Sequence, residues 1–124
     1  MRHFLLTAAA LLAVLPSAAM AHPKLLSSAP AANATVAKPT RLTLTFSEKL
    51  LAPLSGVDLV MTGMPGMANH APMKIPYTAA MGKDGKSMTL ALKRALVPGT
   101  YKVKWSAAGA DTHRMGSEFS FTVK

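Results

Sequence analysis

The feature that most constrains the fold of this chain is a two-residue alternation of apolar and polar side chains. The alternation is clearest in four stretches, residues 41–46, 87–92, 100–106 and 118–123. It predicts β-strands with one buried face, and little of the sequence shows the 3.6-residue period of a helix. Three weaker strand candidates are residues 24–28, 56–61 and 74–80. Turns are predicted at Asp84-Gly85 and at Pro98-Gly99.

About seven short strands in about a hundred residues predict an all-β domain. The expected architecture is a small antiparallel β-sandwich or barrel, immunoglobulin-like, with Greek-key connections. We find no internal repeat and no linker that would divide the chain. A single domain over residues 22–124 is therefore expected, and we expect it to be a monomer.

The first 21 residues have the features of a secretory signal peptide. Arg2 provides a positive charge, residues 4–15 form an apolar stretch, and Ala19-Met20-Ala21 is a suitable cleavage site. The apolar stretch is too short to cross a membrane as a helix. Cleavage before His22 would release an exported protein with no transmembrane span, although Ser17-Ala18-Ala19 is also an acceptable cleavage site.

The amino-acid composition limits the metal ligands and the partners that such an exported domain could have. The chain has no cysteine, so disulfides cannot stabilise it, and a site for a soft metal would need thioether and imidazole ligands. Lys and Arg outnumber Asp and Glu by 14 to 5, but the basic residues are dispersed. Export argues against a nucleic-acid partner. The charge indicates a solvated surface that could attract an anionic membrane or an acidic partner.

A methionine-rich stretch, residues 61–73, is called the methionine segment below. One methionine or histidine stands at every third position: Met61, Met64, Met67, His70 and Met73. Four Gly and Pro residues oppose a helix, whereas a polyproline-like segment has three residues per turn and would align the five side chains. Thioether sulfur and imidazole are ligands that select Cu(I). The alternative is an apolar patch beneath a loop, because Met fills irregular spaces well.

The methionine segment must curl if it is to hold one ion. Successive sulfur atoms on a straight polyproline-like segment would be about 9 Å apart, which is too far for one ion. Gly63 and Gly66 would permit the necessary bend.

A second candidate site would be created by cleavage before His22. The new α-amine and the imidazole Nδ1 of His22 could chelate one ion, and Pro23 has no backbone N–H to add a third nitrogen. Asp111-Thr-His113 could complete the site, since alternate side chains of an extended chain point to the same side. This nitrogen and oxygen ligand set favours Cu(II). Alternatively, Asp111 caps a turn and His113 is a solvent-exposed loop residue.

Five parts of the chain resemble one family. They are His22-Pro-Lys-Leu-Leu-Ser-Ser-Ala-Pro, Phe46-Ser-Glu-Lys-Leu, the methionine segment, Gly99-Thr-Tyr-Lys-Val-Lys-Trp, and Asp111-Thr-His113 followed by Gly116-Ser. Together they resemble CopC, the family of periplasmic copper-resistance proteins, over essentially the whole mature chain. Arg114 is a departure, because a proline commonly follows the histidine in the family.

The resemblance implies a periplasmic protein with two separate copper sites. A Cu(II) site would consist of His22, Asp111 and His113. A Cu(I) site would be formed by Met61, Met64, Met67, His70 and Met73. The implied role is to sequester and carry copper and to exchange it with membrane partners such as CopD, without catalytic turnover.

Two other functional classes remain open from the sequence alone. Copper monooxygenases use a similar brace made by a first-residue histidine and a second histidine. However, this chain is short, shows no aromatic platform for a polymeric substrate, and would place Asp111 where oxygen must bind. The other class is a structural immunoglobulin-like module whose methionine segment is only an interaction patch.

Overall fold

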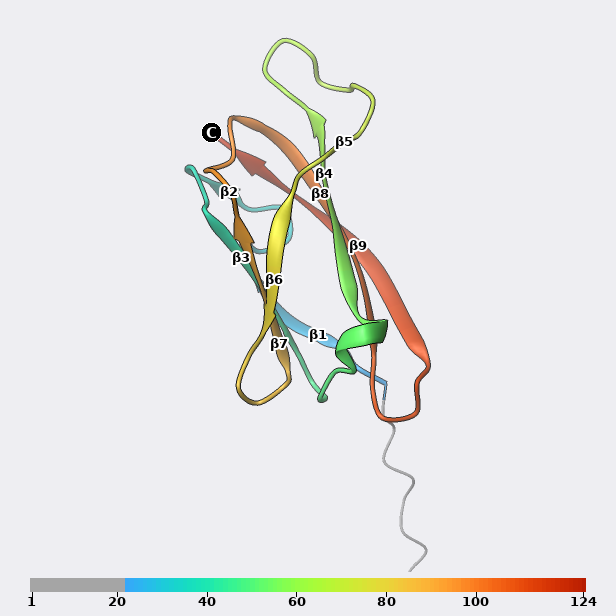
Figure 1. Ribbon diagram of the computed structural model, residues 1–124. Coiled ribbons are helices and arrows are strands. Elements are labelled where there is room, and N and C mark those ends of the chain that lie inside the picture. The colour runs from blue at the N-terminus through green and yellow to red at the C-terminus, as the bar shows by residue number, and fades with distance from the viewer. Residues whose placement is uncertain (1–21) are drawn as a thin grey trace, which may run out of the picture.

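The computed structural model describes residues 22–124, so the predicted signal peptide lies outside the described part of the chain. Two β-sheets pack face to face (Figure 1). One sheet has the strand order β1 (Leu25–Ala29), β3 (Arg41–Phe46), β7 (Ser87–Leu92), β6 (Tyr77–Met81). The other has the order β2 (Thr35–Val36), β9 (Arg114–Val123), β8 (Gly99–Ala108), β4 (Gly56–Gly63), β5 (Met73–Lys74). A 3-10 helix, Ala52–Leu54, precedes β4.

The predicted all-β sandwich is confirmed. Seven strands have five or more residues, and the neighbours β3–β7 and β4–β8 are crossovers of the Greek-key kind. Strands β3 and β7 have the predicted bounds, and Gly85 lies in the predicted turn with a φ of +72°. The predicted strand at residues 74–80 is wrong as a single strand. It is divided by Pro76, which cannot donate a backbone hydrogen bond, and its halves belong to different sheets.

The core lies between the sheets and is formed by the inward-facing side of the alternating strands. Two aromatic pairs help to fill it: Phe46 contacts Trp105 edge to face across the sheets, and Tyr101 stacks on Phe121. Each large side chain buried in this way contributes about 1.5–3 kcal/mol to folding. The other large buried side chains include Leu42, Leu44, Leu59, Met61, Met88, Leu90, Leu96 and Val103.

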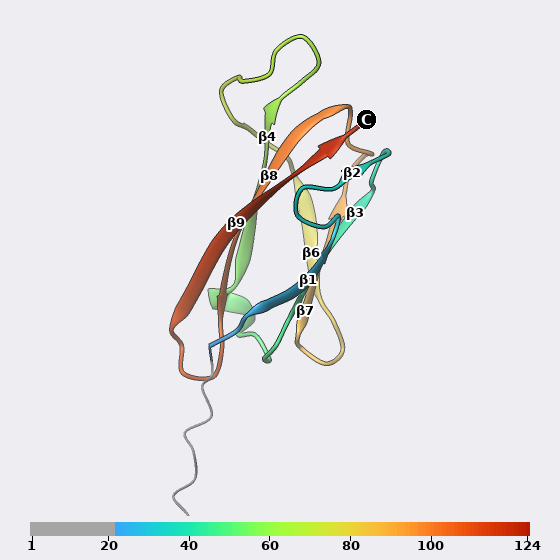
Figure 2. The same cartoon turned by 180° about the vertical axis from the view of Figure 1, so that it is seen from behind.

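Strand β8 runs from one end of the sandwich to the other. Thr100 pairs with Gly63 at the end that carries the methionine segment, and Ala108 leads into the turn before β9 at the opposite end. Eight residue steps of about 3.3 Å place these ends roughly 26 Å apart. Figures 1 and 2 show the β4–β5 connection at one end, and the start of the described chain beside the β8–β9 turn at the other. Within residues 22–124, no helix is long and apolar enough to cross a membrane.

Alkaline pH is expected to destabilise the fold through its two tyrosines. Burial raises the pKa of the Tyr77 and Tyr101 hydroxyls above the ordinary value of 10.0, although each donates a hydrogen bond to a backbone carbonyl. Because the folded-state pKa values are the higher ones, this stabilisation is complete below pH 10 and is lost as the pH rises through them. Urea unfolding between about pH 8 and about pH 11 should show the decline. In a variant with both tyrosines changed to phenylalanine, the free energy of unfolding should decline less over this pH range. An equal decline would show that the two hydroxyls do not cause it.

Candidate metal centres

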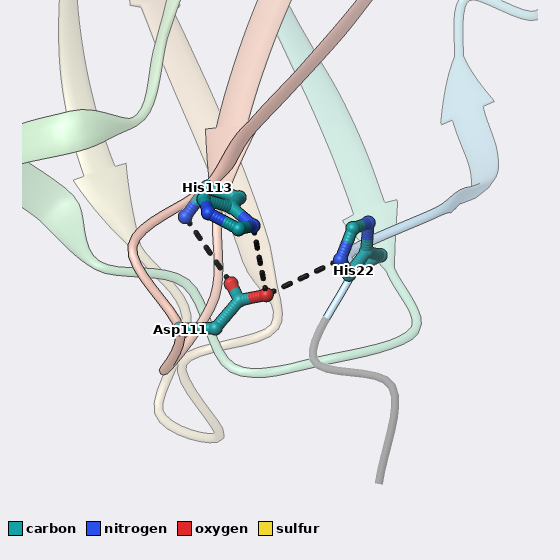
Figure 3. Close-up of side chains that lie close together, drawn as sticks. All are labelled: His22, Asp111 and His113. Atoms are coloured by element: carbon teal, nitrogen blue, oxygen red, sulfur yellow. Dashed lines mark hydrogen bonds and ion pairs between the residues drawn. The ribbon is translucent and has the colours of Figure 1, made fainter. Parts of the chain in front are cut away.

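His22, Asp111 and His113 form a cluster at the end of the sandwich where the described chain begins (Figure 3). Among residues 22–124, this is the one group of three His, Cys, Asp or Glu side chains whose potential ligand atoms lie within 4.8 Å of one another. The Oδ2 atom of Asp111 is 3.2 Å from Nε2 of His22 and 3.5 Å from Nδ1 of His113. We call this group the histidine–aspartate cluster. The structure brings together all three residues of the predicted Cu(II) site.

The local chain conformation of the cluster differs from the sequence-based expectation. Asp111 and His113 were expected to converge because the chain is extended, but Thr112 has a φ of +66° and lies in a turn. The Thr112 N–H donates to the Gly109 carbonyl at 3.0 Å, and the His113 N–H donates to Oδ1 of Asp111 at 3.2 Å. Asp111 is thus a turn-capping residue as well. One carboxylate oxygen fixes the turn, and the other faces the two imidazoles.

Anchoring contacts hold His22 close to this turn. Pro23 is fully buried, and the Lys24 N–H and carbonyl bond to the Oγ and N–H of Ser47, each at 2.9 Å. The turn is supported in a similar way, because Ala108 accepts from the Leu51 N–H and donates to Oγ of Ser55. Sequence reasoning missed the anchoring role of Ser47. No periodic pattern marks it, and its partner lies 23 residues away in the chain.

The spacing of the cluster is suitable for one ion. With a metal–nitrogen bond of about 2.0 Å, neighbouring donors in a square plane are about 2.8 Å apart and opposite donors about 4 Å apart. The 3.5 Å between Oδ2 of Asp111 and Nδ1 of His113 lies between these limits, and the 3.2 Å contact of Oδ2 with Nε2 of His22 leaves Nδ1 of that ring available for an ion. The imidazole rings meet at 77°, with centroids 5.9 Å apart, so neither ring covers the other. His113 is mostly exposed and His22 partly so, which leaves an ion in the cluster open to exchange.

At the opposite end, the methionine segment bends sharply between Met64 and Met67. The backbone N–H of each donates to the carbonyl of the other at 2.9 Å, and Gly66 has a φ of +82°. Pro65 and Gly66 therefore occupy the central positions of a type II turn, where proline and glycine are preferred. The predicted curl is confirmed, and a straight polyproline-like segment is not formed. As antiparallel bridge partners, Met64 and Met67 direct their side chains to the same side.

His70 presents one nitrogen that is well suited to bind a metal. The His70 N–H donates to the Thr62 carbonyl at 3.0 Å, which ties the returning chain to β4. The imidazole Nδ1 lies 2.8 Å from the Ala71 carbonyl and must donate, because a carbonyl only accepts. The neutral ring then carries its lone pair on Nε2. That atom is buried and has no hydrogen-bond partner among residues 22–124.

The two remaining methionines of the segment differ in exposure. Met61 and Met73 are paired across β4 and β5 and line one hollow of about 270 Å³. Met73 is exposed, whereas Met61 is buried in the core, because the alternation of β4 turns it inward with Leu59. The structure therefore groups Met64 with Met67 and leaves Met73 accessible. It places Met61 in the apolar packing instead of the exposed segment.

Comparisons with known proteins indicate one family, and the similarity covers most of the chain. Residues 25–124 match the model of the CopC domain. Copper resistance protein C from Escherichia coli is 47% identical over 106 residues, which cover 86% of this chain and 84% of that protein. The protein of the same name from Xanthomonas campestris pv. juglandis is 46% identical over 108 residues, covering 87% and 84%.

A solved structure supports the same relationship. The crystal structure of PcoC, a methionine-rich copper resistance protein from Escherichia coli, is similar to this fold with a TM-score of 0.76. The two chains are 44% identical, and the similarity covers 84% of this chain and 100% of PcoC.

Proposed function

This chain belongs to the CopC family, and from that premise we propose that it binds copper in two oxidation states and contributes to copper resistance. The observation that carries the proposal is the separation of two different donor sets at opposite ends of β8. Nitrogen and oxygen donors gather in the histidine–aspartate cluster, and sulfur donors gather in the methionine segment. The first set suits Cu(II), and the second suits Cu(I).

In the proposed Cu(II) site, each residue of the cluster has its own part. Cleavage before His22 provides an α-amine beside the ring, and Nδ1 of His22 is free to chelate with it because Nε2 faces Asp111. His113 provides a second imidazole. Oδ2 of Asp111 lies between the rings, where it can orient both of them or bind the ion itself. Arg114 adds a positive charge beside the site.

In the proposed Cu(I) site, Met64 and Met67 form the centre. Met73 and Nε2 of His70 are the further donors, and burial of that nitrogen without a partner among residues 22–124 supports its role. Met61 is assigned to the core. Since the three proposed sulfur ligands are exposed, another protein could reach the ion directly.

Exposure of both centres favours a carrier over a catalyst. We propose that the exported protein acts in the periplasm as a monomer and exchanges copper with an inner-membrane transporter of the CopD type or with other periplasmic copper proteins. Its excess of basic residues would assist approach to an anionic membrane surface. We assign no catalytic step, because Asp111 places a carboxylate between the two imidazoles, where oxygen would have to bind. We assign no nucleic-acid partner, because the protein is proposed to be exported.

Spectroscopy of the mature chain tests this proposal. Cu(II) and Cu(I) are added to separate samples of residues 22–124, and their ligands are identified by electron spin echo and X-ray absorption measurements. Cu(II) should show imidazole nitrogen and no sulfur, and Cu(I) should show sulfur neighbours. Sulfur bound to Cu(II), or failure of both ions to bind stoichiometrically, would contradict the proposal.

The two ions are expected to differ in their response to acid. Amine and imidazole ligands must lose a proton to bind, whereas thioethers carry none. Affinity for Cu(II) should therefore fall steeply between about pH 7 and about pH 5, and affinity for Cu(I) should fall less, through His70 alone. Competition titrations with a chelator specific for each ion provide the two profiles. Parallel profiles would count against the assignment of ligands.

Replacing Gly63 with alanine is expected to weaken Cu(I) binding by roughly tenfold, which equals about 1.4 kcal/mol. A Cβ atom at Gly63 would collide with the Ala68 carbonyl, so the backbone of the methionine segment must move. Gly56→Ala, at the other end of β4, is a matched control because its Cβ would meet no atom of residues 22–124 within 4 Å. Cu(II) binding should be unchanged in both variants. Equal Cu(I) affinities would show that the path of the segment does not matter.

A further inference from the structure

Among the described residues, one group of methionines is exposed to solvent and another is buried, with Met81 between them. Met64, Met67 and Met73 are 37%, 53% and 52% exposed, whereas Met61 and Met88 are 4% and 3% exposed. Met64 and Met67 also line an open hollow of about 500 Å³ between the methionine segment and the adjoining ends of β8 and β9. Small solutes therefore have a direct path to these thioethers. Met115, which lies beside the histidine–aspartate cluster, is 39% exposed and serves as a comparison.

We propose that Met64, Met67 and Met73 are sites of oxidation by hydroperoxides, and that forming their sulfoxides switches off the Cu(I) site. The inference rests on the proposed function, because it assumes that these three sulfur atoms bind Cu(I). It adds a chemical modification that controls the proposed Cu(I) site and leaves the histidine–aspartate cluster unchanged.

The reaction is a two-electron transfer of oxygen from hydrogen peroxide. A lone pair of the thioether sulfur attacks one peroxide oxygen, so that an S–O bond forms while the O–O bond breaks. The departing oxygen takes up the peroxide proton as water is formed. The sulfur is oxidised to a sulfoxide, and the peroxide is reduced to water.

The reaction changes the donor class of the segment. A sulfoxide is polar and presents a hard oxygen, whereas Cu(I) selects soft thioether sulfur. Because Met64 and Met67 are bridge partners that point to the same side, oxidation of both would remove two neighbouring ligands. The histidine–aspartate cluster contains no sulfur and should keep its affinity. A bound soft ion should protect the thioethers, since the lone pair that attacks peroxide is the one donated to the ion.

Peroxide treatment followed by peptide mass mapping tests the inference on the mature chain. Met64, Met67, Met73 and Met115 should be oxidised at least about tenfold faster than Met61 and Met88, given their exposure. Ag(I), a soft ion that does not itself cycle with peroxide as Cu(I) does, should protect Met64, Met67 and Met73 but not Met115. The oxidised protein should lose at least about tenfold in Cu(I) affinity and none in Cu(II) affinity. Met115→Leu should show the same losses.

The results distinguish failure of the oxidation switch from failure of the proposed Cu(I) site. If Met64, Met67 and Met73 are oxidised no faster than Met88 while Ag(I) still binds the segment, the oxidation switch is refuted and the proposed Cu(I) site stands. If they are oxidised rapidly but Ag(I) does not protect them and Cu(I) affinity is unchanged, the proposed Cu(I) site is refuted, and the switch with it.

Discussion

Replacing His113 with alanine is expected to lower Cu(II) affinity by roughly a hundredfold or more and to leave Cu(I) affinity unchanged. The substitution removes one of the two imidazoles that face Oδ2 of Asp111, and the turn remains capped because the cap uses the backbone N–H of residue 113. A competition titration with a Cu(II) chelator measures the loss. His70→Ala is the matched control, since it removes an imidazole from the opposite end of the chain. Equal Cu(II) affinities for His113→Ala and the unchanged chain would contradict the site.

The same site can be tested at its other histidine without changing a side chain. Acetylation of the α-amine of the mature chain removes this donor and breaks its chelate with Nδ1 of His22, and Pro23 provides no N–H to replace it. Cu(II) affinity should then fall about as much as in His113→Ala. An acetylated form that binds Cu(II) as tightly as the mature chain would show that His22 does not chelate through its own amine.

Replacing Met64 and Met67 together with leucine is expected to lower Cu(I) affinity by roughly a hundredfold, about 2.7 kcal/mol, and to leave Cu(II) affinity unchanged. Leucine keeps the volume and the apolar character but provides no ligand. The type II turn should persist, because Pro65 and Gly66 determine it and its hydrogen bonds are between backbone atoms. Competition with a Cu(I) chelator under anaerobic conditions measures the change.

Met115→Leu is the control for this prediction. Met115 is as exposed as Met64 but lies beside the histidine–aspartate cluster. Its substitution should leave Cu(I) affinity within a factor of about two. If the double variant lost both ions equally, the two-site account would be wrong.

The fold was predictable from the sequence to the extent that alternation determines which face of a strand is buried. Strands β3 and β7 have the predicted bounds because both ends of each are marked by a change in pattern. The two-residue strand β2 was not predicted, since it pairs in parallel with β9 through contacts that no local pattern reports. The alternation of β4 continues through Met61, so the same rule that identified the strand also places this methionine in the core.

The candidate sites were predictable by residue type but only partly by conformation. The pairing of His22 with Asp111 and His113 follows from their chemistry, whereas the left-handed Thr112 that brings the last two together could not be read from an extended-chain rule. Likewise, the bend at Pro65 and Gly66 follows from local turn preferences. Nε2 of His70 has no hydrogen-bond partner in the described part of the chain because of how the returning chain packs against Thr62, which is a tertiary effect.

We propose that the two ends of β8 bind different oxidation states of copper independently. The most direct measurement loads the mature chain with Cu(II), adds Cu(I) under anaerobic conditions, and follows the Cu(II) signal by electron paramagnetic resonance with total copper by native mass spectrometry. Sites at strand ends that are roughly 26 Å apart should hold two ions per chain, with the Cu(II) spectrum unchanged as Cu(I) binds. A single ion per chain, with loss of the Cu(II) signal as Cu(I) displaces it, would contradict the account.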